Sequence, residues 1–315
     1  MLRHSLGPVK HGPTRMKTRT PPTAPATGRL TRPTVAATAR QIIGWLRQHR
    51  DPKRAQGVQQ YFRHEVVSLG IATPALRAFA AAQAQPLTAA WGLAEAIALC
   101  DVLLREPELE IRGMGILVLG AFRREFRPAL TRAARGWLET RLDNWALVDS
   151  FCGSVLSPLL QEHPGVEKTL RQWSGARGLW VRRAAVVTLV PFARHGRLLD
   201  TAYELAGEHF ADPEDLMHKA VGWLLREAGK TDPPRLREYL CRHGPAIPRT
   251  TLRYAIERFP APQRRQLLER TRPPACRSRS GCASRPAKLP ARRFRDGNAP
   301  SECTADRRHR LTAGL

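Results

Sequence analysis

The sequence has few acidic residues, few cysteines and no long apolar run. Its 27 Asp and Glu stand against 52 Lys and Arg, and the formal net charge of +25 points to a polyanionic partner, most often nucleic acid. The six cysteines are scattered without a CxxC pair or a Cys/His cluster, so the sequence supports neither a metal site nor a disulfide scaffold. The lack of any run of about 18 apolar residues excludes a membrane-spanning helix of ordinary length.

These absences also indicate the cellular compartment in which the protein works. The N-terminus lacks the apolar core of a secretory signal, and unpaired cysteines suit a reducing compartment. We therefore expect a monomeric protein of the bacterial cytoplasm, associated with the nucleoid, that needs no cofactor, metal or membrane.

The two ends of the chain differ in composition from its middle. Residues 1–34 are rich in Pro, Thr and Arg and hold seven Lys or Arg and no acid, while residues 270–315 hold twelve Lys or Arg against three acids. Such segments bury too little apolar surface to offset the entropy of ordering. We expect a disordered basic arm over 1–34, a folded domain over 35–272 and a disordered Arg/Pro-rich tail over 273–315.

Between these ends, apolar residues recur at three- and four-residue steps, which predicts a series of amphipathic helices and almost no strand. Thr73 and Pro74 are expected to cap and begin one of them, and another is expected to begin at Pro86. Helices joined by short breaks bury their apolar stripes most simply by stacking in pairs. The sequence therefore predicts an all-α fold, an α-solenoid of HEAT-like repeats with a concave DNA-binding face. The expected helical segments are 36–64 (broken at Asp51-Pro52), the helix from Thr73-Pro74 that carries Leu76, Phe79 and Ala80, and then 86–106, 109–124, 128–142, 147–160, 166–173, 179–193, 198–209, 215–230, 234–241 and 248–259.

The stretch from Asn144 to Ser150 combines an aromatic residue with an acid. Positions four apart share a helix face, so Trp145 and Asp149 should lie side by side. In so basic a chain, this pairing suits chemistry on a cationic centre in DNA. The alternative is that Trp145 packs between helices while Asp149, followed by Ser150, caps the next helix.

Two later stretches also place charged residues beside tryptophan. Arg182 and Arg183 follow Trp180, and their alternative reading is a solvated edge with the indole in the core. In the third stretch, Lys219 and Trp223 share a helix face with Arg226 or Glu227, and the alternative is a buried Trp223 with a Lys219–Glu227 link on the rim. Gly222 would let another backbone approach closely.

Taken in order, these motifs resemble the DNA alkylation repair family of HEAT-like glycosylases over about residues 36–260. The residues that carry the resemblance are Tyr61-Phe62, Gly70-Ile71-Ala72-Thr73-Pro74, Asn144-Trp145-Ala146-Leu147-Val148-Asp149, Trp180-Val181-Arg182-Arg183-Ala184-Ala185 and Lys219-Ala220-Val221-Gly222-Trp223-Leu224-Leu225-Arg226-Glu227. The chain departs from the family pattern in two places. Its long basic C-terminal tail is not part of the pattern, and Ala146-Leu147 occupy positions that are often more polar or aromatic in the family.

The resemblance implies an enzyme that binds duplex DNA and excises cationic N3- or N7-alkylated purines, such as 3-methyladenine and 7-methylguanine, without needing to flip the base into a pocket. It implies that Asp149 is the catalytic acid, that Trp145 and Trp223 are aromatic walls, and that Arg183 is the basic residue beside them. Relatives without the aspartate bind DNA but leave the base in place.

Basic residues near these motifs are also expected to belong to the site. Arg182, Lys219 and Arg226 are expected to contact DNA phosphates, and Arg182 could share the role of Arg183. Two other classes remain open at this point. One is a non-catalytic helical-repeat protein that binds distorted or branched DNA, and the other is a protein–protein scaffold.

Removing both ends should leave a folded enzyme. A protein truncated to residues 35–272 should melt close to the full chain, because the hydrophobic periodicity lies inside those limits. Its affinity for undamaged duplex should fall, since the removed ends carry 14 of the 25 net charges. Thermal melting and binding at several salt concentrations measure both effects. A much earlier melt, or binding without excision, would show that an end completes the fold or the site.

Overall fold

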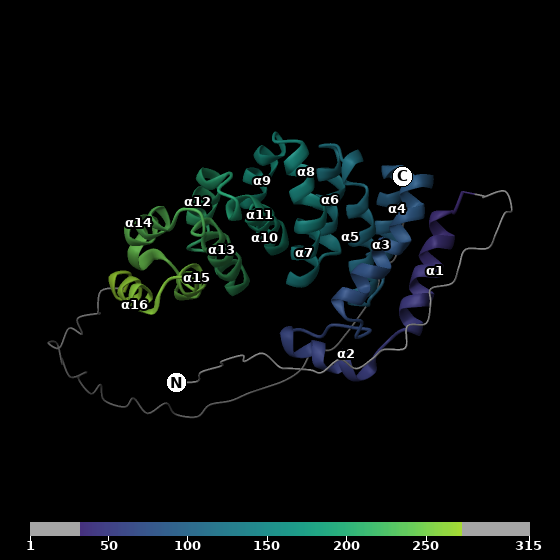
Figure 1. The fold of residues 1–315 in the computed structure, drawn as a ribbon, viewed down its shortest axis with the longest axis horizontal. Helices are drawn as coiled ribbons and strands as arrows, with labels where there is room; N and C mark the ends of the chain where they lie inside the picture. Colours follow the sequence, from purple (N-terminus) through teal and green to yellow (C-terminus); the bar gives the residue numbers. More distant parts are fainter. Residues whose placement is uncertain (1–31, 273–315) are drawn as a thin grey trace, which may run out of the picture. The chain divides into compact units, whose positions relative to one another are not determined.

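The computed structural model describes residues 32–272 of the chain. Within that range the chain forms helices α1 to α16 with short 3₁₀ turns and one π turn, and no strand (Figure 1). None of the described helices is both long and apolar enough to cross a bilayer. Most of the expected arm and all of the expected tail lie outside the described residues. The α-helices are α1 Val35–Gln48, α2 Pro52–Val58, α3 Thr73–Ala90, α4 Leu93–Leu103, α5 Leu109–Ala121, α6 Leu130–Thr140, α7 Trp145–Phe151, α8 Ser157–Glu162, α9 Val166–Ser174, α10 Leu179–Thr188, α11 Val190–Arg194, α12 Leu199–Glu208, α13 Asp215–Ala228, α14 Pro233–His243, α15 Arg249–Ala255 and α16 Ala261–Arg270.

Five helices form a continuous row that we call the spine: α5, α7, α10, α13 and α15. Each spine helix packs against the next, and α4, α9 and α12 pack on α5, α10 and α13 respectively (Figure 1). Their apolar faces make one hydrophobic core whose largest fully buried side chains include Phe122, Phe126 and Phe151. This pairwise stacking confirms the predicted all-α solenoid of helical repeats.

Several expected helix boundaries were wrong, and α16 lies beyond the last expected helix. Two of the wrong boundaries concern α3. Pro86 does not begin a helix but lies inside α3, where its missing N–H removes one backbone hydrogen bond. Burial of Ala84 and Leu87 in the core stabilises the last turn despite that loss. At the other end of α3, Thr73 is the first helical residue rather than the cap.

Gly222 allows α13 and α15 to approach closely, as the sequence suggested. A Cβ atom added there would lie 2.5 Å from the Cβ of Tyr254 and 2.7 Å from the carbonyl oxygen of Thr251. Real Cβ atoms do not come so near to other atoms, so only glycine fits between these two spine helices.

Replacing Gly222 by alanine should therefore destabilise the fold. We expect Gly222→Ala to lower the free energy of unfolding by about 1–3 kcal/mol, because backbone or core must shift to accommodate the methyl group. Gly136→Ala is the matched control, since nothing lies within 4 Å of its added Cβ inside α6. The control should be neutral or stabilising by up to about 1 kcal/mol. Equal unfolding free energies for the two variants in urea would contradict the packing described.

Candidate active site and nucleic-acid interface

A cleft of about 690 Å³ lies along the spine helices α7, α10 and α13. It brings together the three stretches that the sequence singled out, although they are far apart in the chain. The predicted residues that line it are Trp145, Asp149, Arg183, Lys219, Trp223 and Arg226. Residues without a predicted role also line it, among them Tyr61, Phe62, Arg63, Asp143, Trp180, Asp215 and Tyr254. A second cleft of about 770 Å³ contains none of the predicted site residues.

Helix α7 sets the direction of Trp145 and Asp149. The buried side chain of Asn144 caps the helix by accepting a hydrogen bond from the Leu147 N–H at 3.1 Å, which stabilises it by about 1 kcal/mol. Leu147, with its neighbour Val148, is buried in the core, so the opposite face carries Trp145 and Asp149 into the cleft. Asp149 therefore lies inside α7 and does not cap a following helix.

A π turn, Cys152–Leu156, follows α7 directly. Pro158 lies in the first turn of α8 and cannot donate a backbone hydrogen bond. The carbonyl oxygen of Ser154 lies close to Gly120, where an added Cβ would be 2.9 Å from it. The absence of a Cβ at Gly120 therefore lets α5 pack tightly against the π turn that follows α7.

Asp149 and Arg183 form a two-point ion pair. The Nε and Nη2 atoms of Arg183 donate to the two carboxylate oxygens at 2.9 and 2.8 Å, and its Nη1 donates to the Leu216 carbonyl at 2.5 Å. The side chains of Asp149 and Arg183 are only 17% and 5% exposed. Burial raises the pKa of Asp149 above its usual range, and the charge of Arg183 opposes that rise. Arg183 thus holds the carboxylate in one orientation and favours its ionised form.

The segment 59–66, which we call the aromatic strap, lies against Trp145. The ring of Phe62 stacks on the indole with centroids 5.4 Å apart and an angle of 21°, and the indole N–H donates to the Tyr61 carbonyl at 3.4 Å. Gln59 holds the strap in shape: its amide donates to the Phe62 and His64 carbonyls, and its side-chain oxygen accepts from the Val66 N–H. Tyr61 is 66% exposed at the cleft.

The buried carboxylate of Glu110 fixes the residues that directly follow the strap to the spine. It accepts hydrogen bonds from the Ser68 hydroxyl and from the backbone N–H groups of Leu69, Gly70 and Ile71, at 2.7 to 3.2 Å. Gly70 has a φ of +75°, and a Cβ there would lie 2.2 Å from the Asp51 carbonyl oxygen. Residues 68–71 therefore anchor the aromatic strap to α5.

Lys219 and Arg226 reach the cleft already paired with acids. Lys219 Nζ lies 2.8 Å from Asp215, and Arg226 forms ion pairs with Glu257 and, at 3.5 Å, with Glu227. Trp223 is half-buried between them on α13. All three predicted α13 residues thus line the cleft, as their helical spacing suggested.

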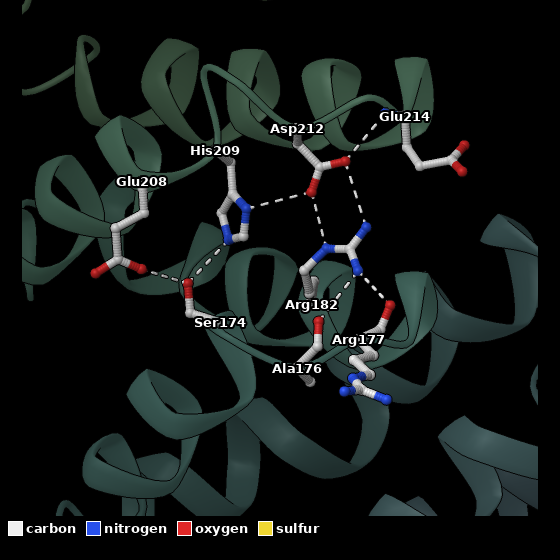
Figure 2. Close-up of polar contacts among 8 residues, drawn as sticks. All are labelled: Ser174, Ala176, Arg177, Arg182, Glu208, His209, Asp212 and Glu214. Atoms are coloured by element: carbon white, nitrogen blue, oxygen red, sulfur yellow. Dashed lines mark hydrogen bonds and ion pairs between the residues drawn. The ribbon is translucent and has the colours of Figure 1, made fainter.

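Arg182 takes part in a different network (Figure 2). Its Nε and Nη2 donate to Asp212 at 2.8 and 3.3 Å, and its Nη1 donates to the carbonyls of Ala176 and Arg177 at 3.1 and 2.5 Å. The side chain is only 15% exposed and does not line the cleft. Arg182 therefore fixes the turn before α10, and this placement gives no support to its predicted contact with a DNA phosphate.

The same network contains a serine, a histidine and an aspartate in a row (Figure 2). Ser174 Oγ lies 2.8 Å from His209 Nε2, and His209 Nδ1 lies 3.5 Å from Asp212. These residue types form hydrolase triads, but Ser174 and His209 are 2% and 4% exposed, and the hydroxyl also bonds Glu208 at 2.6 Å. No substrate can reach a hydroxyl buried in this way, so the network is structural.

A helical solenoid whose cleft joins a buried acid, its arginine, tryptophans and surface cations has the features of a protein that acts on nucleic acid. The chain belongs to the family of DNA alkylation repair enzymes, whose family model matches residues 42–259. Its role is therefore in the repair of alkylation damage, with DNA as the partner. Among the described residues, no three or more His, Cys, Asp or Glu side chains are grouped to hold a metal ion.

A solved structure agrees with this assignment at the level of the fold. The chain is similar to a predicted DNA alkylation repair enzyme from Enterococcus faecalis, with a TM-score of 0.61 and 18% identity over 67% of this chain and 97% of that one. No curated protein sequence matches the chain.

Acid should destabilise the fold through His209. Burial lowers the pKa of His209 below its usual range, against the opposing charges of Asp212 and Glu208. Between that lowered pKa and the ordinary value of about 6.5, the unfolded chain binds a proton that the folded chain does not. Stability should therefore fall as the pH drops below about 6.5, and this fall should be smaller in His209→Gln.

The measurement is the urea-unfolding free energy of the parent and the variant at several pH values between neutrality and the acid range. His195→Gln, which removes an exposed histidine, is the control and should keep the pH dependence of the parent. Equal pH dependence in His209→Gln and the parent would show that His209 is not the group responsible.

Proposed function

We propose that the protein is a monofunctional DNA glycosylase that hydrolyses the N-glycosidic bond of cationic N3- or N7-alkylated purines in duplex DNA. The observation that carries the proposal is the Asp149 carboxylate, held at two points by Arg183 in a cleft walled by tryptophan.

The main catalytic requirement of this reaction is stabilisation of the positive charge that develops on the deoxyribose. Alkylation at N3 or N7 makes the purine cationic, so the bond from C1′ to the purine nitrogen breaks with its electron pair passing to the base. The deoxyribose then carries the positive charge, as in glycoside hydrolysis. Water attacks C1′ and its proton passes to Asp149 or to solvent. A carboxylate about 4 Å from the sugar, at an effective dielectric of about 20, contributes about 4 kcal/mol, roughly a thousandfold in rate.

Arg183 has two opposing effects on the charge stabilisation by Asp149. It offsets part of the negative charge, but it also keeps the buried carboxylate ionised and oriented before substrate arrives. A group that needs no reorganisation during the reaction stabilises the transition state more effectively than a mobile one. The ion pair therefore gives a site whose carboxylate is fixed in orientation, although its net negative charge is reduced.

Trp145 and Trp223 have complementary roles in the proposal. Their rings line the cleft on α7 and α13, on either side of α10, where they exclude water from the sugar. The negative face of an indole also attracts a neighbouring cation, by about 0.5–2 kcal/mol. Phe62 and the Tyr61 carbonyl hold Trp145 in place for this contact.

Lys219 and Arg226 are the proposed phosphate contacts near the lesion. Both line the cleft, and both would exchange an acidic partner in the protein for a phosphate of the DNA. Such contacts position the duplex without reading its sequence.

One observation favours a second function, DNA binding without base excision. Both oxygens of Asp149 are engaged by Arg183, which is also what a purely structural ion pair would show. The protein would then recognise distorted or branched DNA and leave the base in place. The two functions differ in a single measurable step, the release of the alkylated base.

Asp149→Asn decides between them. A carboxylate that stabilises charge mainly in the transition state affects rate more than binding, so base release should fall by roughly a thousandfold while duplex affinity stays within a few-fold. Because burial raises the pKa of Asp149, excision by the parent should also decline on the acid side at a higher pH than an ordinary aspartate would give. Single-turnover release of methylated purines from alkylated duplex, measured across pH, tests both.

Asp143→Asn is the control for this experiment. Asp143 lines the same cleft but pairs with Arg112 at 3.0 Å and does not contact Asp149 through any described bond. Circular dichroism must show that both variants are folded, since breaking a buried ion pair costs about 3–5 kcal/mol. Base release by folded Asp149→Asn at the parent rate would rule out the proposed role of Asp149.

A further inference from the structure

A second carboxylate in the cleft, Asp215, gathers the donors that a phosphate would use. Lys219 Nζ lies 2.8 Å from its Oδ2 atom, and Arg63 Nη2 lies 3.7 Å from the same atom. The Thr250 hydroxyl donates to Oδ1 at 3.1 Å. These donors come from three separate segments: the aromatic strap, α13 and α15. Lys219 and Arg63 account for part of the lowering of the pKa of Asp215.

The position of Asp215 differs from that of Asp143 and Asp149, which also line the cleft. Asp149 is buried against Arg183, and Asp143 pairs with the mostly buried Arg112, so neither withdraws an exposed cation. Asp215 instead neutralises Lys219, which is 36% exposed, and Arg63, which is 87% exposed. In a protein that needs cations to hold DNA, this acid works against binding.

We propose that Asp215 occupies, in the free protein, the place that a backbone phosphate of duplex DNA takes between Lys219, Arg63 and Thr250. The inference rests on the proposed function for the identity of the partner. Carboxylate and phosphate oxygens accept hydrogen bonds from the same ammonium, guanidinium and hydroxyl donors, so one can replace the other in this cluster. Asp215 is then an internal competitor for DNA.

The competition has a direct effect on specificity. Undamaged duplex encounters Lys219 and Arg63 already paired with Asp215. Its phosphates therefore bind this part of the cleft more weakly than the protein's net charge of +25 would suggest. Since each phosphate contact releases bound counterion, two partnered cations also lower the salt dependence of binding. Asp215 thereby weakens binding of the cleft to the intact DNA that surrounds any lesion.

The competition also involves the aromatic strap. The Arg63–Asp215 ion pair joins the strap to α13, and both residues line the cleft. A phosphate that displaced Asp215 would take over this bridging position and would keep Arg63 at the cleft. DNA binding would therefore hold the strap in place instead of releasing it.

The test compares Asp215→Asn with the parent in binding to an undamaged duplex oligonucleotide over a range of salt concentrations. Asparagine keeps an oxygen that can accept from Thr250 but loses the charge. Affinity should rise about twofold to fivefold, the range expected when an exposed ion pair is released. The slope of log affinity against log salt should steepen by up to about one unit, because a displaced Asp215 carboxylate attracts a cation from solution and so reduces the net counterion release of the parent. Adding Lys219→Gln to Asp215→Asn should return the affinity to the parent value or below.

Asp143→Asn is again the matched control, because it adds the same single charge at the same cleft without freeing an exposed cation. It should leave the salt slope at the parent value. An unchanged slope in Asp215→Asn, or an equal change in both variants, would overturn the inference and indicate at most a general effect of net charge.

Single-turnover base release separates this inference from the proposed function. At saturating protein, the rate of base release reports catalysis separately from affinity, and both proteins keep Asp149 and Arg183. If no base is released by either protein but Asp215→Asn binds duplex more tightly, the proposed glycosylase function fails and the phosphate competition stands. Equal affinity and slope in the two proteins would remove the competition whatever the rate of release.

Discussion

The ion pair between Arg183 and Asp149 links three spine helices through one guanidinium. Arg183 belongs to α10, its partner lies on α7, and its remaining bond reaches the Leu216 carbonyl at the start of α13. Because the side chains of Arg183 and Asp149 are only 5% and 17% exposed, leaving either charge unpaired would cost several kcal/mol. The geometry of the candidate site and the register of the neighbouring helices therefore depend on the same contacts. A substitution at Arg183 alters both together.

The sequence predicted the fold well because the forces that make a solenoid are local. Three- and four-residue spacing of apolar side chains marks each helix, and short connections leave pairwise stacking as the simplest arrangement. The local rules failed at Pro86, where the missing hydrogen bond normally ends a helix. Tertiary burial of Ala84 and Leu87 outweighed that loss, and burial of this kind is not visible in the local pattern.

The candidate site was predictable to the extent that its residues share a helix face. Trp145 and Asp149 are four apart, as are Lys219 and Trp223, and each pair does line the cleft. Spacing could not separate Arg182 from Arg183. Adjacent helical residues point about 100° apart, and either could have faced the cleft. Which one does so depends on Asp212, an acid on a different segment that holds Arg182 in its own network (Figure 2).

The aromatic strap has a consequence for how the protein folds. In a solenoid each repeat contacts only its neighbours, so folding can begin in one place and spread along the chain. The strap departs from this arrangement, because its backbone bonds Trp145 across 84 positions and its Arg63 reaches α13 still further along. Closing so long a loop is slow compared with forming helix pairs. A chain that has emerged only as far as α10 can therefore hold Asp149 and Arg183 together while its cleft still lacks one wall, and the complete cleft appears only after the later repeats have formed.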